Sequence, residues 1–111
     1  MFGTIMRARL RKERLRDFLA LGKEWEAARR RQVTGFSGAQ LLWEENEPGR
    51  FCLVVHFVDE DSYRKNAASP EQDAFYGRMR DCLEEDPEWI DGDWAAWDAY
   101  DARPPRWATA T

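Results

Sequence analysis

The side chains with the greatest capacity for chemistry in this sequence are one histidine and a group of aromatic residues. His56 is the only histidine, and because the unperturbed pKa of imidazole lies near neutrality, it is a candidate general base. Tyr63 carries a hydroxyl that can donate or accept a hydrogen bond. Aromatic side chains with few polar groups are the usual lining of a small-molecule site. The remaining candidates for such a lining are Trp25, Trp43, Phe57, Phe75 and Tyr76.

Other kinds of site lack the residues that they need. One histidine and two cysteines far apart in the sequence do not make a recognisable zinc or iron site. There is no glycine-rich phosphate loop and no dinucleotide-binding fingerprint. The sequence therefore predicts neither a metal nor a cofactor, and we expect Cys52 and Cys82 to be small buried groups rather than a disulfide.

His56 and Phe57 lie in the run from Phe51 to Val58, which is apolar at nearly every position and rich in Val and aromatic residues. Such a run is typical of a central strand that is buried on both faces. Because side chains alternate along a strand, His56 and Phe57 cannot both point into one pocket unless the strand bulges. The sequence leaves open which of the two does so.

The other elements follow from periodicity and from turn and cap residues. Strands are predicted over residues 2–10, 35–45, 51–58 and 88–94, and helices over residues 12–30, from Asp59 or Asp61 to Asn66, and over residues 69–85. The order of the main elements is strand, helix, strand, strand, helix, strand. This order predicts a ferredoxin-like α+β fold, with a four-stranded antiparallel sheet and both long helices on one face.

Each long helix has a signal of its own. An apolar stripe is predicted on the first helix at Leu15, Phe18, Leu19, Gly22 and Trp25. The second is predicted to begin with Ser69 as N-cap and Pro70 in the first helical position, with Gln72 completing a capping box.

The central strand also predicts how the protein assembles. Helices cover one face of the sheet, yet residues 51–58 are apolar on both faces. A second copy of the sheet is the expected cover, so we predict a homodimer. The domain is expected to span residues 1–94, followed by a C-terminal arm over residues 95–111, in which Trp97 and Tyr100 are expected to pack on the same protomer or on its partner.

Composition narrows the location and the partners. A chain of 111 residues is large enough for one core. It lacks an apolar run of about 18 residues, which predicts no membrane span, and its start lacks the features of a signal peptide, so we expect a cytoplasmic protein. Residues 7–31 hold ten Lys or Arg against four acids, whereas residues 84–101 hold eight acids and no base. Because the net charge is -4, a solvated basic face is favoured over a nucleic-acid-binding surface.

With its elements placed, the sequence resembles the antibiotic biosynthesis monooxygenase (ABM) domain family, whose members form dimeric α+β barrels. The resemblance spans residues 1–94. It is carried by the segments Val33-Thr34-Gly35-Phe36, Val55-His56-Phe57-Val58-Asp59-Glu60-Asp61-Ser62-Tyr63 and Ala68-Ser69-Pro70 with Phe75 and Tyr76. A Trp often stands at the position of Phe57 in that family. The family includes cofactor-free oxygenases of polycyclic phenols and haem-degrading enzymes, so the pattern is specific for the fold and less so for the reaction.

The resemblance implies a cofactor-independent monooxygenase-like protein that acts on an aromatic or polyketide-like small molecule. In such a reaction a hydroxyaromatic substrate is deprotonated and reacts with dioxygen, and the resulting peroxide collapses to a quinone. His56 would be the base, and Tyr63 or Tyr76 would hold the phenolic oxygen.

Three alternatives stay open. The protein could be a non-catalytic dimeric module that binds a small molecule, because no second clear catalytic polar group is evident. It could degrade haem, with His56 as the ligand, although no Asn and Trp pair is placed as that activity requires. His56 could also be a strand-end residue bonded to backbone or lying in the dimer seam, with the tyrosines as ordinary core.

Overall fold

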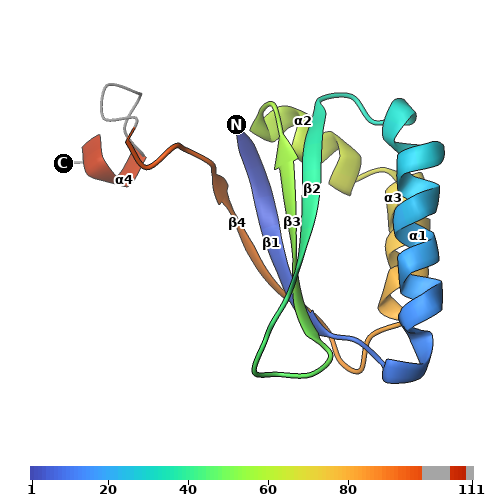
Figure 1. Ribbon diagram of the computed structural model, residues 1–111. Helices are drawn as coiled ribbons and strands as arrows, with labels where there is room; N and C mark the ends of the chain where they lie inside the picture. Colours follow the sequence, from blue (N-terminus) through green and yellow to red (C-terminus); the bar gives the residue numbers. More distant parts are fainter. Residues whose placement is uncertain (99–105, 110–111) are drawn as a thin grey trace.

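The computed structural model describes residues 1–98 and 106–109 of the chain (Figure 1). The strands are β1 (Phe2–Arg9), β2 (Phe36–Trp43), β3 (Arg50–Phe57) and β4 (Glu88–Asp93). The α-helices are α1 (Leu15–Ala27), α2 (Glu60–Ala67), α3 (Pro70–Arg80) and α4 (Arg106–Thr109), and the 3-10 turns are η1 (Lys12–Arg14) and η2 (Arg29–Gln32).

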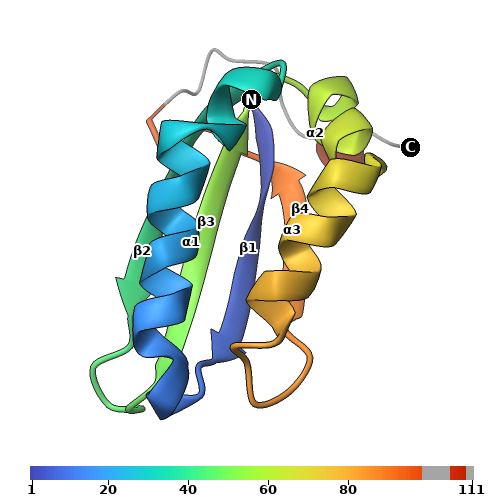
Figure 2. The same cartoon turned by 90° about the vertical axis from the view of Figure 1, so that its right-hand side faces the viewer.

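The four strands form one antiparallel sheet in the order β2-β3-β1-β4. Helices α1 and α3 lie side by side across one face of this sheet, and α2 lies at one end of it (Figures 1 and 2). The predicted ferredoxin-like α+β fold and the central position of β3 are therefore confirmed.

The core lies between the sheet and the two long helices. Strand alternation puts one set of side chains on this helix face, and its buried members include Met6, Phe51 and Phe57. From α1 the buried residues are Phe18 and Leu21. The predicted apolar stripe on α1 was therefore partly wrong, because Leu15 and Leu19 are 41% and 44% exposed. Both cysteines are free thiols, as predicted, and Cys82 is buried whereas Cys52 is half-buried.

The ends of α2 and α3 show which local signals are reliable. Asp59 caps α2 by accepting a bond from the Ser62 backbone N–H at 2.8 Å, and Ser69 caps α3 by accepting one from Gln72 at 3.1 Å. The predicted reciprocal half of the capping box was wrong, because the Ser69 N–H donates to the Asn66 carbonyl instead.

Helix α3 ends at Arg80, five residues before the predicted end at Glu85. The reason is that the Leu83 N–H donates to the Arg80 carbonyl in a tighter turn, and the Glu84 N–H then donates to the Arg9 carbonyl of β1. Hydrogen bonds to the sheet thus replace helical hydrogen bonds before the helical sequence pattern ends.

Strand β2 contains a bulge that changes which of its side chains face the helices. Phe36 pairs with Phe57, but Gly38 pairs with His56, so Ser37 is an extra residue in the ladder. As a result Phe36 packs on the helix face, with its ring centroid 5.7 Å from that of Phe57. Strict alternation from Leu41 would have placed Phe36 on the opposite face.

The opposite face of the sheet, which we call the outer face, carries an apolar row. Val54 and Ile5 are half-buried in its centre, whereas Leu42 and Ile90 are 60% and 64% exposed. None of the described helices lies across this row in Figure 1. The expectation that β3 is apolar on both faces is met, and among the described residues no helix covers the outer face.

Beside this row, Arg7 and Glu44 form a two-point ion pair, with Nε–Oε2 and Nη2–Oε1 distances of 2.8 and 2.8 Å. The hydrogen bond from Arg7 lowers the pKa of the Glu44 carboxyl below its ordinary value. A carboxyl whose folded-state pKa is lowered contributes stability that is present above its unfolded-state pKa and lost as the pH falls through the folded-state value. We therefore expect the free energy of unfolding to decrease as the pH drops below about 4.5. The decrease should be less steep in Glu44→Gln. Urea unfolding at a series of pH values measures this, and parallel profiles for the two proteins would contradict it.

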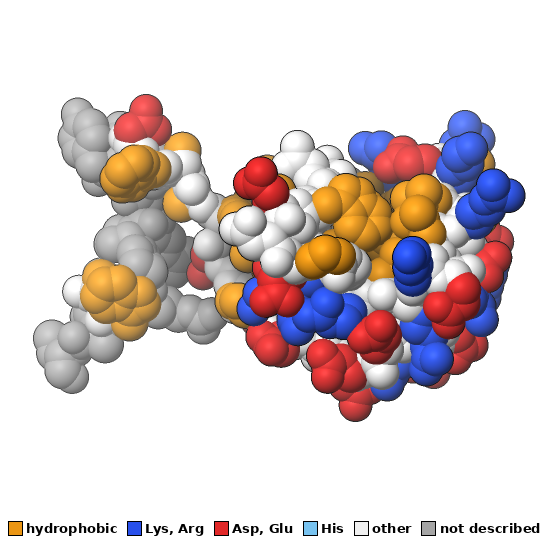
Figure 3. Space-filling model, turned by 60° about the horizontal axis from the view of Figure 1, so that its bottom comes forward, with side chains coloured by type: hydrophobic (Ala, Val, Ile, Leu, Met, Phe, Trp, Pro, Cys, Tyr) orange, Lys and Arg blue, Asp and Glu red, His pale blue; other side chains and the backbone are white. Residues whose placement is uncertain are grey.

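The described part of the acidic segment, residues 84–98, forms no ion pair with the basic first helix. Its partners are on strands and on the other helices: Glu84 with Arg9, Glu85 with Arg50, Asp86 with Arg80 and Asp91 with Arg64. Figure 3 views the molecule with the strand connections at the bottom of Figure 1 turned forward, and on that face acidic and basic side chains are interspersed.

The chain is hydrogen-bonded to the sheet as far as Trp94. The Trp94 backbone N–H donates to the Met1 carbonyl at 2.8 Å, whereas Trp97 and Trp107 are 105% and 80% exposed. Tyr100 lies outside the described residues. We keep as a proposal the domain over residues 1–94 and the C-terminal arm over residues 95–111. Within the part of the chain that is described, no helix is long and apolar enough to cross a membrane.

Candidate functional site

A cavity of about 680 Å³ lies between the helix face of the sheet and the helices. We call it the aromatic cavity, because its walls hold aromatic rings from five elements besides α1. Its volume is typical of small-molecule sites. The aromatic residues that line it are Phe18, Trp25, Phe36, Phe57, Tyr63, Phe75, Tyr76 and Trp89.

Five of these rings form a continuous wall, in which Phe36 also contacts Phe57. The ring of Trp25 lies 5.1 Å from Phe36 and 5.6 Å from Phe75, measured between centroids. Phe57 lies 5.6 Å from Tyr63 and meets it edge to face. Tilted and edge-on contacts of this kind are favourable for aromatic pairs, so the wall is held in place by its own packing.

Two sequence-predicted site residues lie elsewhere. Trp43 packs against Phe51 with a centroid distance of 5.7 Å and is 43% exposed, and it does not line the aromatic cavity. His56 lies on the outer face between Gly3 and Gly38 of the neighbouring strands. Of His56 and Phe57, it is therefore Phe57 that points into the cavity and lines it.

The surroundings of His56 do not fit its predicted part as a base in this cavity. Its ring lies 4.5 Å from that of Trp94, and its Nδ1 is buried without a hydrogen-bond partner. The sheet itself separates the imidazole from the aromatic cavity, because residues next to each other on a strand point to opposite faces.

The cavity has a hydrogen-bonded polar pair of its own. The Tyr63 hydroxyl donates to Asp91 Oδ1 at 3.0 Å, and Arg64 Nη1 donates to Asp91 Oδ2 at 3.3 Å. Tyr63 and Asp91 both line the cavity. Burial, and then the bond to Asp91, raise the pKa of Tyr63 above its ordinary value, so this hydroxyl keeps its proton at neutral pH and acts as a donor.

Two further polar atoms at the cavity wall lack partners. Trp25 Nε1, a donor, and Gln72 Oε1, an acceptor, are buried and form no hydrogen bond. Buried polar atoms in proteins are nearly always paired. A donor and an acceptor left unpaired on residues that line one cavity are therefore positions that a polar ligand would satisfy.

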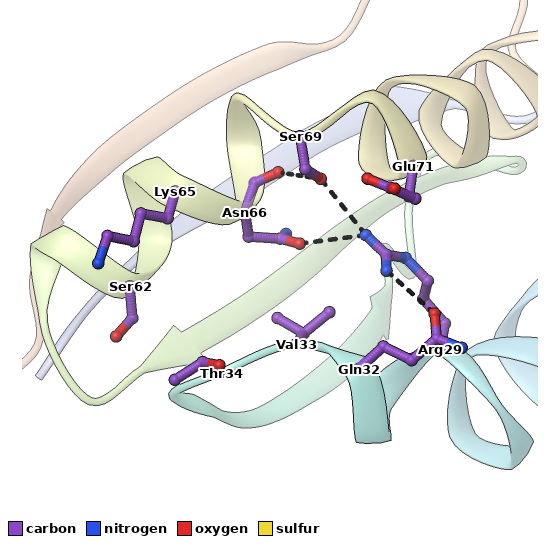
Figure 4. Close-up of a pocket in the computed structure, with 9 residues that line it drawn as sticks. All are labelled: Arg29, Gln32, Val33, Thr34, Ser62, Lys65, Asn66, Ser69 and Glu71. Atoms are coloured by element: carbon purple, nitrogen blue, oxygen red, sulfur yellow. Dashed lines mark hydrogen bonds between the residues drawn. The ribbon is translucent and has the colours of Figure 1, made fainter.

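A second cavity, of about 380 Å³, adjoins the first. Asn66 of α2 lines both of them. We call it the polar cavity, because its lining holds charged and hydroxyl groups, among them Arg29, Thr34, Ser62, Lys65, Ser69 and Glu71 (Figure 4).

Sequence reasoning missed several of these residues. Phe36 is displaced to the cavity by the bulge in β2, for which the sequence has no plain signal. Asp91 was detectable in principle, because alternation in β4 puts it on the same face as Trp89. The sequence marks Gln72 only as a capping residue, and Arg29 only as one of the basic residues of the segment 7–31.

Comparison with known proteins agrees with this architecture. A crystal structure of an antibiotic biosynthesis monooxygenase is 17% identical, with 86% of this chain and 100% of that chain covered and a TM-score of 0.68. A candidate antibiotic biosynthesis monooxygenase from Caulobacter crescentus CB15 is 14% identical, covers 86% of this chain and 90% of its own, and has a TM-score of 0.73. A conserved protein from Methanosarcina mazei Go1 is 15% identical, with coverage of 82% and 89% and a TM-score of 0.70. At such identities these structures show the fold alone.

The sequence itself carries the family assignment. No curated protein matches it. The family model described as antibiotic biosynthesis monooxygenase, however, matches residues 1–78, which include three of the four strands, α1, α2 and all but the last two residues of α3. The chain therefore belongs to the antibiotic biosynthesis monooxygenase family.

Proposed function

We propose that this protein is a cofactor-independent monooxygenase-like enzyme that oxidises a hydroxylated aromatic or polyketide-like molecule in the aromatic cavity. One observation carries the proposal: the Tyr63–Asp91 pair, joined at 3.0 Å, lies at the wall of a cavity whose lining includes eight aromatic residues. A carboxylate beside a neutral phenol is a suitable pair for removing a proton and holding the resulting oxyanion.

In this reaction Asp91 takes the proton of a substrate hydroxyl, and the Tyr63 hydroxyl turns its hydrogen bond to the phenolate oxygen. The phenolate is then electron-rich at a ring carbon, which bonds to dioxygen and gives a peroxide. Loss of water from that peroxide leaves a quinone. The balance is one hydroxyaromatic and one dioxygen to one quinone and one water, so the substrate supplies all the electrons.

The test is oxygen uptake by the purified protein, freed of metal and flavin, with a panel of reduced polycyclic phenols. We expect uptake above the spontaneous rate, together with quinone formation in equal amount. No uptake above that rate with any member of a panel that binds to the protein would overturn the proposal.

A non-catalytic binding module of the same fold is the second candidate. The observation that favours it is the position of His56, the only histidine of the chain, on the outer face. The cavity thus has no imidazole to act as a base or to bind haem iron. Tight binding of the same phenols without uptake would identify this function.

The proposal includes a homodimer formed through the outer face. The family is typically dimeric, and the row of Ile5, Val54 and Ile90 is apolar and uncovered in the protomer. We expect light scattering to give a dimer at micromolar concentration and a monomer for Val54→Asp, because an unpaired charge is costly in an apolar interface. Leu15→Asp, at an exposed position on α1 across the opposite face of the sheet, is the control and should remain dimeric. A monomeric wild-type protein would contradict this prediction.

A further inference from the structure

The polar cavity contains a positive charge without a negative partner. Arg29 forms no ion pair with any described residue, and its three hydrogen bonds go to neutral acceptors: Gln32 Oε1, Asn66 Oδ1 and Ser69 Oγ. All three donor–acceptor distances are 3.4 Å, at the long end for a hydrogen bond. Arg29 Nε is buried and has no partner.

The other side chains of the cavity leave this charge available. Among the described residues that line the polar cavity, Glu71 is the one carboxylate, and it does not pair with Arg29. Lys65, the second base, pairs with Asp61 at 3.3 Å. In Figure 4 the Arg29 guanidinium points toward Asn66 and Ser69 across the cavity. A half-buried guanidinium normally binds a carboxylate or phosphate in a two-point contact, and here that contact is missing.

The same arginine also joins the two cavities. Its guanidinium carbon lies 6.0 Å from the centroid of the Trp25 ring, which lines the aromatic cavity. Asn66, which accepts a bond from Arg29, lines both cavities. An acidic group bound at Arg29 is therefore within reach of a ring system bound beside Trp25.

We propose that Arg29, held in position by Ser69 and Asn66, is an anion subsite that binds the carboxylate of an aromatic acid whose rings occupy the aromatic cavity. The proposal rests on the proposed function only in that the ligand is aromatic. It narrows the substrate class from hydroxylated aromatic molecules to hydroxylated aromatic acids.

The test is a binding measurement that needs no turnover. Isothermal titration calorimetry compares 6-hydroxy-2-naphthoate with 2-naphthol, which has the same ring system and hydroxyl but no carboxylate. We expect the naphthoate to bind wild-type protein about tenfold more tightly or better, as a hydrogen-bonded charge pair provides. Arg29→Gln should lose this difference while binding 2-naphthol as before. Arg31→Gln removes the same charge from an exposed neighbour in η2 and should keep the difference.

Each other outcome overturns the inference in a distinguishable way. Equal affinity of the two compounds for wild-type protein refutes the anion subsite and leaves the aromatic cavity and the proposed function intact. Failure of both compounds to bind refutes the subsite and the proposed function together. If acetate added with 2-naphthol reproduces the full advantage of the naphthoate, the anion is a separate molecule, and the claim of a single aromatic acid is wrong. The wild-type comparison decides these cases even if Arg29→Gln does not fold.

Discussion

Replacing Asp91 by Asn is expected to lower the rate of oxygen uptake by about 10²- to 10⁴-fold, the usual contribution of a positioned acid–base group. The amide still accepts the bond that the Tyr63 hydroxyl donates at 3.0 Å, so the wall of the cavity is preserved. The amide cannot take a proton from the substrate, however. The rate constant kcat should therefore fall, while KM changes little. The measurement is initial rates with an oxygen electrode, using the best substrate of the phenol panel.

Two further variants make this result specific. Tyr63→Phe removes the neutral donor and should cost about 10²-fold, as loss of one oxyanion donor does. His56→Ala changes the outer face and should leave the rate at the wild-type value, because the sheet separates it from the cavity. A wild-type rate in Asp91→Asn would exclude that carboxylate as the base. Loss of oxygen uptake in His56→Ala would indicate that the histidine takes part in the reaction.

The largest effect on stability is expected at Phe51, which is fully buried, with an exposed fraction of 0%. Its ring packs against Phe18 with a centroid distance of 4.8 Å. Removing such a ring leaves a cavity in the core, so Phe51→Ala should lower the free energy of unfolding by about 3–5 kcal/mol. Domains are usually stable by only about 5–15 kcal/mol, and the variant should therefore be close to unfolding. Urea unfolding followed by circular dichroism measures the change.

The control for this experiment is Val58→Ala, one residue beyond β3, where the side chain is 56% exposed. It should change stability by less than about 0.5 kcal/mol. Protein concentration must be equal in all samples, because the proposed dimer would make the apparent stability depend on concentration. If Phe51→Ala does not fold, Phe51→Leu serves instead, and a loss smaller than that of Val58→Ala would show that this ring is not the centre of the core.

The order of elements was predictable because its signals are local. Asp59 and Ser69 identify the starts of α2 and α3 by bonds to residues three positions away, and the apolar run around Phe57 identifies the central strand. Such signals depend on a few neighbouring residues and survive in almost any fold context. The same reasoning put Trp25 and Phe75 in the aromatic cavity, because helical periodicity assigned them to the face that meets the sheet.

The polar parts of the site depend on long-range contacts that periodicity does not contain. Tyr63 meets Asp91 across 28 positions of sequence, and Asp91 lies in the strand with the weakest pattern. Arg29 meets Ser69 across 40 positions. The position of Phe36 depends on one extra residue in a strand ladder, which moves its ring from one face of the sheet to the other. Only the tertiary structure reveals which of two faces such residues occupy.

The alternation along β3 has a consequence for how this protein can evolve. Over eight residues the strand contributes to two separate surfaces: Phe57, Val55 and Leu53 line the aromatic cavity, and their neighbours His56, Val54 and Cys52 lie on the outer face. A point substitution at one set of positions alters ligand contacts and leaves the outer face unchanged, and the reverse holds for the other set. Substitutions within this one strand can therefore change the wall of the cavity and the outer face independently of each other during evolution.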